Sequence, residues 1–123
     1  MQRDDLERFI RQWLAAWTGN RPTALLEFYA ADAYYQDPAR PQGLSGHEEL
    51  RAYFVRLLAA NPEWVWEPLE IVPTERGCCL KWQATIPTPA GSRSLVGLDL
   101  VEIDRNRITR NEVYFDPAPL RQP

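Results

Sequence analysis

The hydrophobic periodicity of this chain changes near Trp64, and that change limits the possible folds more than any other feature. Before Trp64, apolar residues recur at helical steps of three and four over the segments 4–17, 22–29 and 45–60. After it, apolar and polar residues alternate with the period of two typical of strands, over 64–72, 78–86, 94–103 and 108–115. Short segments containing Pro, Gly or Asn separate these strands, which predicts consecutive antiparallel hairpins.

Helices that precede most of the strands predict an α+β fold. We expect a curved antiparallel sheet of four or five strands, wrapped around three helices from the N-terminal half, with an apolar internal pocket between the two layers. A short strand over 34–37 comes before Pro38 and Pro41, which end the extended segment. Ser45, with Glu48 three residues later, predicts a capping box that starts the third helix. The length predicts a single domain over 1–123.

The composition argues against several classes of function. A net charge of −3 disfavours a nucleic-acid surface. No apolar run approaches the ~20 residues of a membrane helix, and the N-terminus lacks a signal-peptide core, so we expect no membrane contact and a cytoplasmic location. One histidine and the adjacent Cys78 and Cys79 are too few for a standard zinc site. No motif implies a metal or an organic cofactor.

Asp37 is the first candidate for acid–base chemistry. It ends the predicted strand over 34–37 and shares one face with Tyr35, because side chains of a strand alternate. A carboxyl placed among aromatic side chains there would face an apolar pocket. The alternative is a hydrogen-bonded turn aspartate, since Asp37 precedes Pro38.

Asp99 is the second candidate and the stronger local anomaly. It lies inside the apolar run 95–101, where a carboxyl is costly unless it is paired or neutral. A functional carboxyl is one interpretation of this position. An arginine partner, such as Arg51 or Arg110, would instead make Asp99 a structural residue.

Five tryptophans and five tyrosines in 123 residues favour a flat-walled pocket for a small hydrophobic ligand that contains a ring. Tyr53 and Phe54 face the sheet from the third helix, and one of them should line the pocket. Core packing is the alternative for Trp13 and Trp17, which lie one helical turn apart. The candidate binding residues are Trp13, Trp17, Tyr35, Tyr53, Phe54, Trp82 and Phe115.

The outer face of the predicted sheet favours self-association. The segments 64–66 and 95–101 are apolar on both faces, yet three helices can cover only one face. We therefore predict a homodimer formed through the outer face.

Several short motifs, in this order, resemble those of a known family. They are Phe28–Ala33, Gln36–Pro38, Gly46–Leu50, Gly97–Asp104, Arg107–Ile108 and Tyr114–Asp116. With the order of helices and strands, they resemble the nuclear transport factor 2-like superfamily, in its ketosteroid isomerase and SnoaL-like polyketide cyclase branch. The resemblance extends from the first helix to Asp116 and implies the cone-shaped α+β fold. The fold hosts several activities, so it does not by itself give a function.

The resemblance also implies roles for individual residues. Asp37 matches the general base of the isomerases, and Asp99 matches a protonated aspartic acid that donates a hydrogen bond to the developing oxyanion. Trp13 stands where those enzymes have a tyrosine, and its indole N–H is a donor but not an acid. Asp116 matches the acid–base residue of the polyketide cyclases.

These observations predict an enzyme that removes a proton next to the carbonyl of an apolar, cyclic compound, with Asp99 and the Trp13 indole stabilising the enolate. Isomerisation and aldol cyclisation share this first step. A non-catalytic protein that binds a hydrophobic ligand is the alternative. An epoxide hydrolase, which needs two aspartates and an arginine around a water, is the third.

Overall fold

The computed structural model describes residues 1–121 and contains three α-helices, six strands and a short 3-10 helix. Gln122 and Pro123, the end of the predicted domain, lie outside the described residues. The helices are α1 (Arg3–Ala15), α2 (Pro22–Leu26), α3 (His47–Ala60) and the 3-10 helix η1 (Ala118–Arg121). The strands are β1 (Tyr29–Asp37), β2 (Arg40–Ser45), β3 (Val65–Pro73), β4 (Gly77–Thr88), β5 (Gly91–Asp104) and β6 (Arg107–Tyr114).

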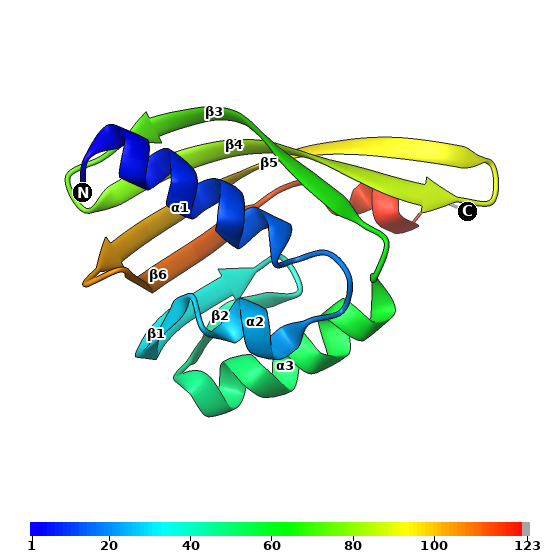
Figure 1. Cartoon of the computed structure of the whole chain (residues 1–123). Coiled ribbons are helices and arrows are strands. Elements are labelled where there is room, and N and C mark those ends of the chain that lie inside the picture. The colour runs from blue at the N-terminus through cyan, green and yellow to red at the C-terminus, as the bar shows by residue number, and fades with distance from the viewer. Residues whose placement is uncertain (122–123) are drawn as a thin grey trace.

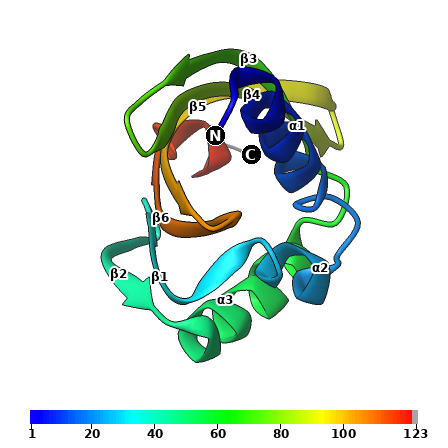
Figure 2. The same cartoon turned by 60° about the vertical axis from the view of Figure 1, so that its left-hand side comes forward.

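The six strands form one curved sheet in the order β2-β1-β6-β5-β4-β3 (Figure 1). The sheet bends around the helices, with α1 against β3 and α3 against β1 and β2 (Figure 2). This arrangement confirms the predicted α+β class and its three helices. No helix among the described residues is long and apolar enough to cross a membrane.

The sheet differs from the prediction in its number of strands and in one pairing. The expected four or five strands are six, because 40–45 forms the edge strand β2 despite Pro41. Proline is tolerated in an edge strand, because one side of that strand has no neighbour that needs its backbone N–H as a hydrogen-bond donor. The pairing of β1 with β6 is parallel, whereas the other four pairings are antiparallel. Strands so distant in sequence leave no local signal of their pairing.

The predicted capping box is wrong. The residue before α3 is Gly46, with φ 87°, and no side chain caps the helix. The backbone N–H of Ser45 donates instead to Glu49 Oε1 at 2.9 Å, so the acid one position later reaches back to it. A positive φ suits glycine, which explains why the chain turns into α3 at this position.

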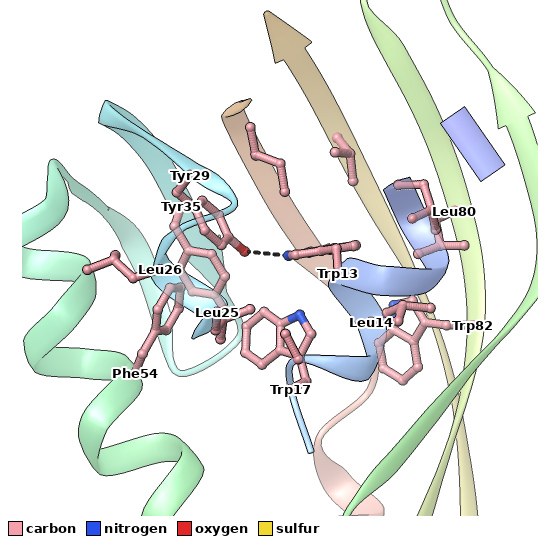
Figure 3. Close-up of a cluster of buried hydrophobic side chains, with 14 of the residues drawn as sticks. Trp13, Leu14, Trp17, Leu25, Leu26, Tyr29, Tyr35, Phe54, Leu80 and Trp82 are labelled. Atoms are coloured by element: carbon pink, nitrogen blue, oxygen red, sulfur yellow. Dashed lines mark hydrogen bonds between the residues drawn. The ribbon is translucent and has the colours of Figure 1, made fainter. Parts of the chain in front are cut away.

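The core lies between the concave face of the sheet and the helices. Strand β4 shows the predicted alternation, with Leu80, Trp82 and Ala84 buried toward the helices and Lys81 exposed. Figure 3 shows side chains from α1, α2, β1, α3 and β4 meeting in one cluster. Aromatic rings pack against one another within it, and Trp17 contacts Tyr35, Phe54 and Trp66 with centroids 5.4–6.3 Å apart.

Candidate active site

A cavity of about 80 Å³ lies between α1, α3 and the concave face of the sheet. Its aromatic wall consists of Trp17, Tyr35, Trp64, Trp66, Trp82 and Phe115. The two candidate acids, Asp37 and Asp99, both line it. Leu57, Trp64 and Trp66 are only half-buried, so the cavity opens to solvent on their side. The structure thus brings both aspartates to one apolar cavity.

Asp37 accepts four hydrogen bonds and is 8% exposed. Its Oδ1 accepts the backbone N–H groups of Ala39, at 2.9 Å, and Arg40, at 3.0 Å, which form the turn between β1 and β2. Its Oδ2 accepts the hydroxyls of Tyr35, at 2.7 Å, and Tyr53, at 2.5 Å. Asp37 is therefore both a hydrogen-bonded turn aspartate and a carboxylate that lines the cavity, although the sequence presented these as alternatives. Four donors without an acceptor suit the anionic form of this carboxyl.

The two tyrosines remain hydroxyl donors at neutral pH. Burial, and then the charge of Asp37, raise the pKa of Tyr35 well above its ordinary value. Burial and the hydrogen bond to Asp37 raise the pKa of Tyr53 as well. Neither hydroxyl therefore loses its proton beside the carboxylate.

Asp99 is 4% exposed and accepts two hydrogen bonds from side chains. Trp82 Nε1 donates to Oδ1 at 2.7 Å, and Asn111 Nδ2 donates to Oδ2 at 2.8 Å. Burial raises the pKa of Asp99 to about 7, against these two bonds, which lower it, and with a smaller contribution from the charge of Asp37. Because both partners donate, a proton on Asp99 finds no acceptor in them and remains available to a ligand in the cavity.

Asn111 connects Asp99 to the interior of α1. Its Oδ1 accepts the hydroxyl of Tyr29 at 2.7 Å, so its amide group must donate to Asp99. Tyr29 in turn accepts Trp13 Nε1 at 3.2 Å, the bond drawn in Figure 3. Burial is the main cause that raises the pKa of Tyr29. The chain of bonds fixes the orientation of the Asn111 amide and hence of the Asp99 carboxyl.

Four of the predicted residues lie away from the cavity wall. Trp13 is fully buried, and Tyr29 takes its indole N–H, so a ligand does not reach it. Tyr53 stands behind Asp37, and Phe54 packs in the core, so neither lines the pocket as expected. Asp116 is exposed and accepts the backbone N–H of Ala118 at 3.0 Å. The position of a residue on a helix face or at a strand end does not by itself determine whether its side chain lies in the core or lines the cavity.

The cavity and its surroundings include residues that were not predicted as ligand-binding. Trp64 and Trp66 belong to the cavity wall. Asn111 lies outside this wall and donates a hydrogen bond to Asp99. Asn111 is fully buried although the charged residues Arg110 and Glu112 flank it in the sequence. Because of these neighbours, the sequence did not indicate that Asn111 is buried. A signal did exist for Trp64 and Trp66, because residues two apart in an extended segment share one face. Here that face lines the cavity, whereas Val65 between them is exposed.

Arginine does not pair with Asp99 in the described residues. Arg110 pairs with Glu112 and, at 3.5 Å, with Glu102, and Arg51 is exposed. The cavity wall, as far as residues 1–121 form it, contains no arginine, which the epoxide hydrolase alternative requires.

The two cysteines and the arrangement of possible metal ligands are further features of residues 1–121. Three or more His, Cys, Asp or Glu side chains do not cluster there as a metal site would need. Both cysteines are free. Burial raises the pKa of the Cys78 thiol to about 12, which keeps it protonated as a packing residue.

Comparison with known proteins agrees with this architecture. Residues 10–111 match the family described as the SnoaL-like domain. No curated protein matches the sequence. Solved structures share the fold at low identity.

One is a hypothetical protein with a ketosteroid isomerase-like fold from Catenulispora acidiphila, in complex with trimethylamine; it is 22% identical, with 88% of this chain and 85% of that chain covered and a TM-score of 0.76. A putative SnoaL-like polyketide cyclase from Shewanella putrefaciens is 12% identical, with 94% and 82% covered and a TM-score of 0.80. TerC, co-crystallised with polyporic acid, is 13% identical, with 93% of each chain covered and a TM-score of 0.75.

Proposed function

The chain belongs to the SnoaL-like domain family, and we propose that its cavity catalyses the removal of a proton next to the carbonyl of a small, apolar, cyclic compound. The observation that carries the proposal is the pair of buried aspartates, Asp37 and Asp99, on one apolar cavity with opposite hydrogen-bonding environments. Four donors suit an anion at Asp37, whereas burial favours a proton on Asp99.

The reaction divides between these two carboxyls. The C–H bond next to the carbonyl breaks, its proton forms an O–H bond with Asp37 Oδ2, and its electron pair becomes the enolate. The proton of Asp99 donates a hydrogen bond to the enolate oxygen, where the negative charge develops. For the transfer, Oδ2 must release one of its two tyrosine hydroxyls, Tyr35 or Tyr53. Isomerases return the proton to a second carbon, and cyclases use the enolate to form a ring.

Hydrogen–deuterium exchange tests this step without knowledge of the natural substrate. We expect the protein in D₂O to accelerate exchange at the carbon next to the carbonyl of 4,4-dimethylcyclohexanone, followed by proton NMR. Asp37→Asn should reduce the rate to that of buffer, whereas Asp32→Asn, an exposed aspartate of the same strand, should not. Exchange that is equal in wild type and Asp37→Asn would refute the proposed base.

A non-catalytic binding protein is the second candidate. It is favoured by the full hydrogen bonding of Asp37 and by Trp13, whose N–H is bound to Tyr29 and cannot assist an enolate. The relatives crystallised with small ligands are consistent with either function. A ligand that binds without any exchange of its protons would identify the binder.

The homodimer and the cytoplasmic location stay predictions. The outer face of the sheet exposes Val65 and Val72 on β3, Val96 and Leu98 on β5, and Tyr114 on β6, each 43–50% accessible. This apolar face supports a dimer formed through it. Light scattering should give twice 14.3 kDa, and a monomer at micromolar concentration would contradict the assembly.

A further inference from the structure

The cavity that contains Asp37 and Asp99 has acidic side chains in its wall and no Lys, Arg or His among the described residues. Neither carboxyl forms an ion pair within residues 1–121. Arg40 stacks 5.1 Å from the ring centroid of Tyr53, which stands outside the cavity wall. The charges of Arg40 and Arg56 act on Tyr53, the hydroxyl donor to Asp37, but neither arginine lines the cavity. The wall itself, as far as residues 1–121 form it, therefore surrounds its negative charge with hydrogen-bond donors and carries no positive charge.

Aromatic rings enclose the same space. Trp64, Trp66, Trp17 and Tyr35 form a continuous row, with successive centroids 5.9, 5.9 and 6.3 Å apart. On the other side, the Trp82 and Phe115 rings meet at 5.8 Å, and Figure 3 shows Trp82 and Tyr35 on opposite sides of Trp17. Ring faces attract cations, and cages of several rings bind substituted ammonium groups.

The size of the cavity sets a further limit. Its volume of about 80 Å³ is smaller than the roughly 150 Å³ cavity that holds benzene in a protein core. A compact group, either a head group or the carbonyl with its neighbouring carbon, fills this space. The remainder of the ligand, including the ring of a cyclic ketone, must extend past the half-buried Trp64 and Trp66.

From this combination we infer that the ligand of the cavity carries a compact, positively charged amino group, a substituted ammonium. The carbonyl and the proton transfer rest on the proposed function, but the preference for a cation rests on the wall alone. A neutral ketone can react there, because four hydrogen-bond donors stabilise the charge of Asp37, but it brings no counter-charge into the cavity. An ammonium ketone keeps the cavity neutral at each step, first as a pair with Asp37 and then as an internal pair with its own enolate.

Choline and 3,3-dimethylbutan-1-ol test the inference, because they have the same shape and differ in the charge of one atom. By calorimetry or tryptophan fluorescence at neutral pH, we expect choline to bind about tenfold more tightly than the alcohol. Trp64→Leu should weaken the binding of choline more than that of the alcohol, and Asp32→Asn, with the same change in charge as an active-site variant, should alter neither. Equal binding of the two probes, or tighter binding of 3,3-dimethylbutanoate, would overturn the inference.

Choline has no carbonyl, so this result is independent of the proposed reaction. A choline preference without ketone exchange supports the cation site and refutes the proton transfer. Ketone exchange without a choline preference refutes the cation site alone.

Discussion

Replacing Trp82 by phenylalanine is expected to raise the pKa of Asp99, because it removes the indole N–H that donates to Oδ1 at 2.7 Å. A hydrogen bond to a charged group contributes about 1.5–3 kcal/mol, and 1.36 kcal/mol corresponds to one pKa unit. The wild-type pKa of about 7 should therefore rise to roughly 8–9 in Trp82→Phe. Phenylalanine is smaller than tryptophan but keeps an aromatic ring at this position, so the wall stays apolar.

Carbon-detected NMR of the side-chain carboxyls measures this value directly, without a substrate. Trp66→Phe is the matched control, since Trp66 also lines the cavity but makes no side-chain hydrogen bond to Asp99. The control should leave the pKa of Asp99 close to that of the wild type. An unchanged or lower pKa in Trp82→Phe would show that the indole does not stabilise the ionised carboxyl, and would refute the role assigned to this bond.

Three further predictions concern stability. The pKa of Asp99 is about 7 in the folded protein and near 3.8 in the unfolded chain, so its ionisation should lower the unfolding free energy by on the order of 4 kcal/mol as pH rises between these values. In guanidinium unfolding, Asp99→Asn should lack this dependence on pH. Wild-type and Asp99→Asn proteins whose unfolding free energies change equally with pH would contradict the prediction. Gly97→Ala places a Cβ 2.3 Å from the Trp82 ring and should cost about 1–3 kcal/mol, with an unchanged melting temperature as the contrary result. Tyr53→Phe removes a donor to Asp37 and should cost about 1.5–3 kcal/mol; chemical denaturation showing no loss would argue against that bond.

The sequence predicted those features that depend on local pattern. Alternation along β4 gave the burial of Leu80 and Trp82, and the apolar neighbours of Asp99 gave its buried carboxyl. Both depend on neighbours within a few residues, because a strand fixes the direction of each side chain. The switch of period near Trp64 likewise located the end of α3 and the start of the strands β3 to β6, although the β1–β2 hairpin lies before it.

Features that depend on distant partners could not be predicted in this way. The spacing of Trp13 gave a buried helix face, but only the contact with Tyr29 on β1 shows that its N–H is used in the core. Asn111 lies between charged residues and becomes a partner of Asp99 only once β6 pairs with β5. Pro41 predicted a break in the extended chain, but the segment 40–45 forms a strand because β2 lies at the edge of the sheet.

The pH dependence of ketone exchange tests the central claim most directly, because the reaction needs a proton on Asp99 and none on Asp37. As pH rises through the Asp99 pKa of about 7, that donor is lost, and we predict that the exchange rate due to the wild-type protein falls. The uncatalysed reaction, driven by hydroxide, rises over the same range and serves as the baseline. A protein-dependent rate that stays level or rises through this pH range would contradict the proposed division of roles between Asp37 and Asp99.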